Sequence, residues 1–166
     1  MSIFPTRILL ATDGSEQAEL AALRAVDLAD ATHSELHVVH VGVVPRFLES
    51  YPGTLGYERR LYDQIEEESR QLLRELSWRV KVVGGTVAGT HLRMGQVDLE
   101  IVALAEELGA DLIVMGCRGH RGIRRAIEGS ISDAVIRHAP CPVLVVPSQE
   151  RAEAPERRPI IHAGGR

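Results

Sequence analysis

The sequence is poor in the residues that stabilise proteins through cross-links. It holds two cysteines among 166 residues, Cys117 and Cys141. Two cysteines this far apart resemble neither a disulfide framework nor a zinc site, so we expect two free thiols. A chain of this length with 45% hydrophobic residues can bury one core without disulfides or metals. We therefore predict a single compact domain.

Long hydrophobic runs and a dominant charge are also missing. No apolar stretch approaches the roughly 18 residues that cross a bilayer, and the first residues lack the basic and apolar regions of a secretory signal. The 19 basic and 23 acidic side chains give a formal charge of −4, which offers no chain-wide attraction to nucleic acid or to an anionic membrane. We expect a cytoplasmic protein that binds neither of them, so any anion-binding site must be local.

Short apolar runs alternate with longer segments of helical period. This alternation predicts an α/β fold with a parallel sheet, and the continuous apolar character of the runs indicates strands that helices cover on both faces. The predicted strands occupy residues 7–12, 35–44, 87–93, 111–116 and 142–146.

Four helices are predicted between and after these strands. The first follows Asp13 and buries a stripe of alanines, and the second covers residues 58–80. The third covers residues 97–108 and ends at Gly109 in a left-handed conformation. The last covers residues 130–139, with Ser130 as its N-cap.

Two segments are rich in proline, glycine and polar residues. We expect residues 45–57 to form a long connection and residues 148–166 to form a flexible C-terminal tail, which leaves residues 1–147 as the folded domain. Both segments are candidate surfaces for a regulatory partner that the sequence does not identify.

The segment GCRGHRGIRRAIEGSIS, residues 116–132, lies between a predicted strand and the last helix. Its glycines lack Cβ atoms, which lets backbone N–H groups approach an anion, and the helix start adds the positive end of a dipole. Its spacing is neither GxxxxGK[ST] nor GxGxxG followed by a distant acidic residue. Ligands of parallel sheets lie beyond the carboxyl ends of the strands, where the ATDGS turn would face this loop. We predict a phosphate-binding loop opposite Asp13.

The spacing Gly116-x2-Gly119-x9-Gly129-Ser130, with its flanks ILLATDGS and HAPCPVLVV, resembles the signature of ATP-binding universal stress proteins over roughly residues 5–147. This resemblance implies an open sheet of five parallel strands in the order 3-2-1-4-5, similar to the adenine nucleotide alpha hydrolases. It also implies a homodimer in which the last strand, which begins at Pro142 and ends at Val146, pairs with its counterpart. Such pairing would cover an apolar edge that otherwise favours aggregation.

The resemblance further implies a site for ATP, or for AMP or ADP, with Mg²⁺ accompanying the nucleotide. Asp13 and Val41 would hold the adenine and ribose, the glycine loop would wrap the phosphates, and the start of the last helix would donate hydrogen bonds. The implied nucleotide-binding residues are Ala11, Thr12, Asp13, Val41, Met115, Gly116, Arg118, Gly119, His120, Arg121, Gly122, Gly129, Ser130, Ile131 and Ser132.

Some of these residues have a simpler structural interpretation. One alternative is that the sole role of Asp13 is to cap the first helix, with Glu16 completing a capping arrangement. Ser130 can cap the last helix and still donate to a phosphate, so its two roles do not compete.

Four other residues need separate interpretation. Cys117 stands where the resemblance implies serine or threonine, and a thiol is a weaker donor than a hydroxyl. Its position beside arginines also raises the hypothesis of an oxidisable site. His37 and His40 are interpreted as structural residues of the second strand rather than metal ligands, and Cys141 as a small packed side chain.

Three functions are therefore open. The leading hypothesis is a nucleotide-binding regulatory protein whose occupancy changes dimer or partner contacts. The second is a slow Mg²⁺-dependent ATPase, in which Asp13 helps to hold the metal, although no motif positions a group to activate water. The third is a dimeric interaction module that binds no nucleotide, which the intact glycine set argues against.

Overall fold

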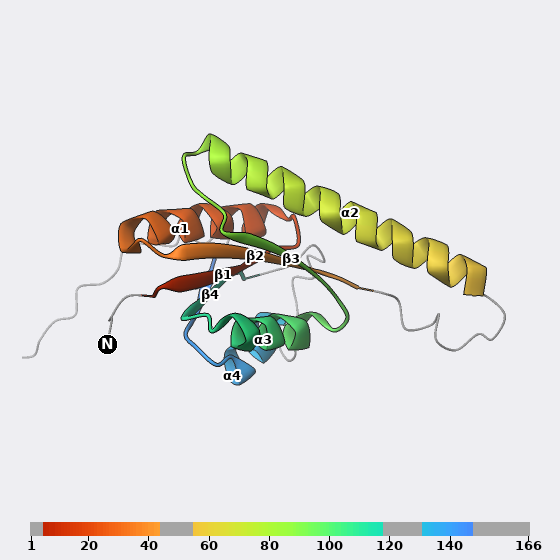
Figure 1. Cartoon of the computed structure of the whole chain (residues 1–166). Helices are drawn as coiled ribbons and strands as arrows, with labels where there is room; N and C mark the ends of the chain where they lie inside the picture. The colour runs from red at the N-terminus through yellow and green to blue at the C-terminus, as the bar shows by residue number, and fades with distance from the viewer. Residues whose placement is uncertain (1–4, 44–54, 118–130, 148–166) are drawn as a thin grey trace, which may run out of the picture.

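The computed structural model describes residues 5–43, 55–117 and 131–147. Its strands form one parallel sheet in the order β3-β2-β1-β4-β5, with α1 and α2 on one face and α3 and α4 on the other (Figure 1). The predicted fold class and strand order are confirmed. In chain order the elements are β1 (Arg7–Ala11), α1 (Glu16–Thr32), β2 (Glu35–Gly42), α2 (Leu55–Val82), β3 (Gly89–Met94), α3 (Val97–Leu108), β4 (Leu112–Gly116), α4 (Ile131–His138) and β5 (Val143–Val146).

The central strand β1 shows why the sequence has continuous apolar runs. Successive side chains of a strand point to opposite faces. Ile8 and Leu10 pack in the core cluster beneath α1 and α2, whereas Leu9 and Ala11 pack in the cluster beneath α3 and α4. Both faces of β1 are therefore buried, and alternation with polar residues is excluded.

The helices follow the predicted stripes. The α1 alanines Ala18, Ala22, Ala25 and Ala29 are all buried. Gly109 ends α3 with φ of 60°, as predicted for a left-handed C-cap. The small side chains of the α1 alanines let this helix lie close to the sheet.

The interpretation of Asp13 as the cap of α1 is wrong. Ser15 is the N-cap, and its side chain accepts a hydrogen bond from the Ala18 N–H. Gly14 intervenes with φ of +76°, which turns the chain before the helix begins and leaves Asp13 outside it. Ser15, and not Asp13, therefore caps α1.

Several boundaries differ from the prediction. β2 ends at Gly42, two residues early, and α2 begins at Leu55, so residues 55–57 belong to a helix rather than to a connection. Gly56 and Tyr57 at the exposed helix start have weak helix propensity, which hid this turn in the sequence. The other predicted elements agree to within two residues, and Ser130, the rest of the connection and the tail lie outside the described residues.

The longest helix, α2, extends past the edge of the sheet (Figure 1). It has 28 residues, but charged side chains cover its outer face. Among the helices that the structure describes, none is both long and apolar enough to cross a membrane.

Candidate functional site

Three of the predicted nucleotide-binding residues meet at the carboxyl edge of the sheet. Ala11 of β1 pairs in register with Met115 of β4, and Val41 of β2 belongs to the same core cluster. Their exposed fractions are 8%, 6% and 7%, respectively. They form an apolar wall on the side of the sheet that α3 and α4 cover.

The turn after β1 carries Asp13 beside this wall. The Thr12 N–H donates to the Val39 carbonyl at 3.0 Å, which continues the pairing of β1 with β2 by one residue. The Gly14 N–H donates to Thr12 Oγ1 at 3.2 Å, and the Ser15 N–H donates to Asp13 Oδ1 at 3.0 Å. The half-buried Asp13 carboxylate is therefore oriented by the backbone of its own turn.

Helix α2 presses on this turn from the opposite side. A Cβ added to Gly14 would lie 2.8 Å from Leu72 Cδ1, closer than side-chain carbons approach. The missing side chain thus lets Leu72 contact the backbone directly beside Asp13.

Gly116 ends β4 at the same edge. A Cβ at this position would lie 3.0 Å from the backbone carbon and oxygen of Gln17 in α1. The glycine therefore allows α1 to approach β4 closely, and its role toward a phosphate stays a prediction. The following residue, Cys117, is half-buried and donates its N–H to the Val146 carbonyl at 2.9 Å.

The start of α4 contributes two predicted residues. Ser132 is buried, and Ile131 is 44% exposed. The remaining predicted residues lie outside the described part of the chain, so the structure does not test them: Arg118, Gly119, His120, Arg121, Gly122, Gly129 and Ser130.

A cleft of about 270 Å³ adjoins the turn on the side of α2. The described residues that line it include four carboxylates, Asp13, Glu19, Glu68 and Glu75, and one cation, Arg79, which pairs with Glu19. A polyphosphate would be repelled by this excess of carboxylates. The cleft shares only the turn with the apolar wall, because α2 covers the other face of the sheet.

One contact at the turn was not predicted from the sequence. His40 Nδ1 of β2 lies 2.8 Å from the Thr12 carbonyl oxygen, so the expected structural histidine has a specific partner. The sequence indicated only that His40 is a structural residue of the strand, because a strand pattern does not say which backbone group a side chain reaches.

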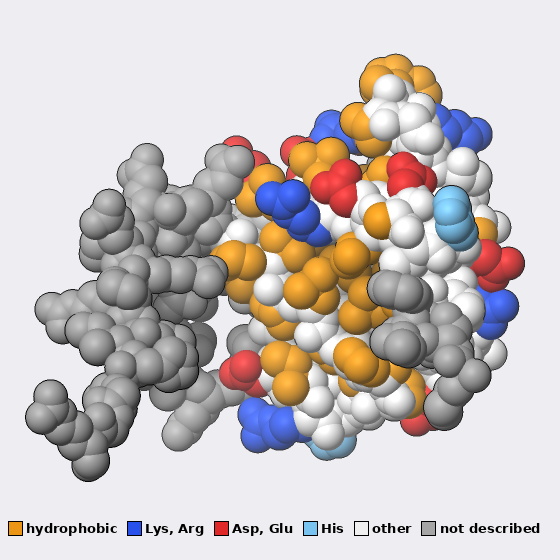
Figure 2. Space-filling model, turned by 90° about the vertical axis from the view of Figure 1, so that its left-hand side faces the viewer, with side chains coloured by type: hydrophobic (Ala, Val, Ile, Leu, Met, Phe, Trp, Pro, Cys, Tyr) orange, Lys and Arg blue, Asp and Glu red, His pale blue; other side chains and the backbone are white. Residues whose placement is uncertain are grey.

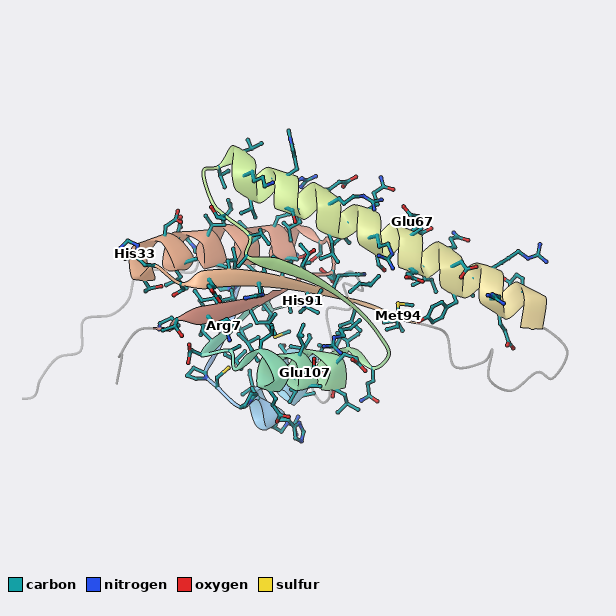
Figure 3. All side chains as sticks on the ribbon, viewed as in Figure 1. Arg7, His33, Glu67, His91, Met94 and Glu107 are labelled. Atoms are coloured by element: carbon teal, nitrogen blue, oxygen red, sulfur yellow. The ribbon has the colours of Figure 1, made fainter. Side chains whose placement is uncertain are left out.

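A polar cluster lies on the far side of β2, toward α3. His37 Nδ1 is 3.1 Å from His91 Nε2 of β3, and Arg93 forms an ion pair with Glu107 of α3. Figure 3 shows His91 on β3 and Glu107 on the helix below it. Burial is the main cause that lowers the pKa of His91, and the positive charges of His37 and Arg93 lower it further. The negative charge of Glu107 opposes this shift.

No described residues form a group of three or more histidine, cysteine or carboxylate side chains that would hold a metal ion.

Comparison with known proteins gives a consistent result. The universal stress protein family matches residues 5–147. A putative universal stress protein of Staphylococcus haemolyticus is 37% identical over 147 residues, which are 88% of this chain and 87% of that protein. The universal stress protein UspA from Lactobacillus plantarum is similar in structure, with a TM-score of 0.76, 25% identity, and coverage of 87% of this chain and 99% of that one.

A further structure with the same fold contains a nucleotide. The universal stress protein from Archaeoglobus fulgidus in complex with dAMP has a TM-score of 0.62 and 23% identity, and the match covers 87% of this chain and 99% of that one.

Proposed function

Because this chain belongs to the universal stress protein family, we propose that it binds an adenine nucleotide at the carboxyl edge of its sheet. ATP is the expected ligand, and Mg²⁺ would arrive with its phosphates. The observation that carries this proposal is the turn that holds Asp13 beside the apolar wall of Ala11, Val41 and Met115. The dAMP complex of the Archaeoglobus fulgidus protein supports it, since that protein has the same fold.

Each part of the site suits one part of the nucleotide. The apolar wall offers a surface for the base, and the Asp13 carboxylate accepts hydrogen bonds from the adenine or ribose. Backbone N–H groups at Ile131 and Ser132 would donate to the phosphates at the start of α4. The loop that contains Gly119 would complete the phosphate site. The acidic cleft beside α2 supports this direction, because it disfavours phosphates on the opposite side of the turn.

We propose binding, rather than rapid turnover, as the activity. Hydrolysis needs a positioned base for the attacking water and neutralisation of the transferring phosphoryl group. Within residues 5–43, 55–117 and 131–147, Asp13 is the carboxylate of the site. We identify no second side chain there as the base that would activate the attacking water. Nucleotide occupancy would then act through changed contacts with a partner.

The first partner that we propose is a second copy of the chain, paired through β5. This strand lies at the edge of the sheet, and its Leu144 is 38% exposed. Ile131 and Ile136 of α4 are also exposed large hydrophobic residues. On the side of the molecule that lies at the left in Figure 1, hydrophobic side chains gather between charged ones (Figure 2). Pairing would cover an open strand edge.

Binding is tested by mass spectrometry of the ligand released from the purified protein and by calorimetric titration with ATP and AMP. Asp13→Asn keeps the acceptor for the Ser15 N–H but removes the charge, and we expect it to lower affinity by about tenfold to a hundredfold. Asp30→Asn, which makes the same change at an exposed position on α1, is the matched control and should bind like the wild type. The proposal fails if no nucleotide is released and neither ATP nor AMP binds.

A further inference from the structure

The carbonyl group that precedes Asp13 is held by a side chain from the neighbouring strand. His40 Nδ1 lies 2.8 Å from the Thr12 oxygen. A carbonyl oxygen only accepts hydrogen bonds, so the imidazole must donate, which assigns the proton to Nδ1. His40 is half-buried and Thr12 is 8% exposed, so water competes weakly for this bond.

This contact extends the sheet beyond the end of β1. The Thr12 N–H bonds to the Val39 carbonyl at 3.0 Å, and the Thr12 carbonyl bonds to the next residue of β2 through its side chain. Both polar groups of the Thr12 backbone are therefore tied to β2. Since a peptide unit is planar, fixing the Thr12 carbonyl also fixes the N–H and the Cα of Asp13.

The other contacts of the turn depend on this orientation. The Gly14 and Ser15 N–H groups bond to the side chains of Thr12 and Asp13, and Leu72 closes the turn from the side of α2. Rotation of the Thr12–Asp13 peptide would shift the Asp13 carboxylate relative to the apolar wall.

We propose that His40 is a positioning residue of the nucleotide site, which sets the direction of Asp13 by holding the Thr12 carbonyl. The effect of His40 on nucleotide binding rests on the proposed function, whereas its effect on the geometry of the turn does not. In this role His40 acts through the Thr12 carbonyl and not by touching the nucleotide. Its removal leaves the apolar wall and the start of α4 intact, and it weakens nucleotide binding by releasing the turn.

Three substitutions of His40 separate the hydrogen bond from the imidazole ring. His40→Leu removes the donor. His40→Asn keeps an N–H at the same number of bonds from the backbone as Nδ1, whereas His40→Gln moves the donor one bond further. His37→Leu is the control on the opposite face of β2, because it breaks the contact with His91 without touching the turn.

The first measurement is the affinity for ATP, together with the urea midpoint of each variant. We expect His40→Leu to lower the affinity about tenfold and His40→Asn to restore it to within about threefold of the wild type, the range of one hydrogen bond. His37→Leu should lower the midpoint and leave the affinity unchanged. Equal affinity of His40→Leu and wild type, or no rescue by asparagine, would overturn the inference. If the leucine variant does not fold, the asparagine variant must bind more tightly than the glutamine variant.

The second measurement uses the ligand-free protein. Amide signals of Gly14 and Ser15 in a ¹H–¹⁵N spectrum should shift in His40→Leu and return toward wild-type positions in His40→Asn. A return in asparagine excludes the lost ring as the cause. Unshifted amides in His40→Leu would refute the positioning role, whether or not the wild type binds ATP. A wild type that binds no nucleotide but shows these shifts would refute only the proposed function.

Discussion

Gly14 is the position at which the packing of α2 against the turn can be measured. Its φ of +76° lies in the left-handed region, and a Cβ there would lie 2.8 Å from Leu72 Cδ1. Gly84 is a matched control, because its φ is +89° and a Cβ there would meet nothing within 4 Å. Gly14→Ala and Gly84→Ala therefore share the backbone strain and differ in the contact.

The expected free energies follow from these two terms. A left-handed conformation costs an alanine about 1–2 kcal/mol. The smaller entropy of the unfolded alanine chain offsets about 0.4–1 kcal/mol of it. We expect a net loss of about 1 kcal/mol for Gly84→Ala. Overpacking costs about 1–3 kcal/mol, and the lower end applies at Gly14 because Leu72 Cδ1 is the end of a half-buried side chain that can shift. Gly14→Ala should lose about 2 kcal/mol in total.

Urea denaturation of both variants gives the comparison, and a double-mutant cycle with Leu72→Ala isolates the contact. The combined Gly14→Ala and Leu72→Ala protein should be more stable than the sum of the single losses predicts, by about 1 kcal/mol. Equal losses for Gly14→Ala and Gly84→Ala, or strict additivity in the cycle, would show that Leu72 does not press on the turn.

Two further predictions concern acid. Burial lowers the pKa of His91, so the unfolded chain binds more protons than the folded protein as pH falls below about 6.5, and the free energy of unfolding should decrease. His91→Gln should flatten this dependence in urea titrations, and identical slopes for the variant and the wild type would contradict the assignment. Hydrogen bonds from the Thr6 hydroxyl and from the Thr6 and Arg7 N–H groups lower the pKa of Asp111. Asp111→Ala should therefore lose stability, by up to about 1 kcal/mol for such an exposed charge, at neutral pH. This difference should vanish as pH falls through the folded pKa, below the usual carboxyl range, and a difference that persists there would exclude the carboxylate as its source.

The site shows where prediction from the sequence succeeded and where it stopped. The ATDGS turn was predicted at the carboxyl edge of the sheet, and Ala11, Val41 and Met115 do meet there. The capping role considered for Asp13 was wrong, because Ser15 is also a good N-cap and its side chain accepts the hydrogen bond from the Ala18 N–H. The phosphate-binding residues were assigned by resemblance, and most of them lie outside the described residues.

The sequence alone determined which stretches form helices and strands, apart from a few terminal residues such as the first turn of α2, and which faces of these stretches are buried. Apolar residues recur with the period of the helix or strand that buries them. The alanines of α1 and the apolar runs of β1 and β4 therefore reveal the buried faces. The strand order came from the family resemblance, because periodicity does not say which strands are neighbours.

Only the tertiary structure decided how the turn that carries Asp13 is held. His40 is 28 residues from Thr12 in the sequence, and Leu72 belongs to α2, which follows β2. Whether such side chains reach the turn depends on strand register and on the position of α2 over the sheet. Both are set by the packing of the whole domain, and neither leaves a local pattern in the amino-acid sequence.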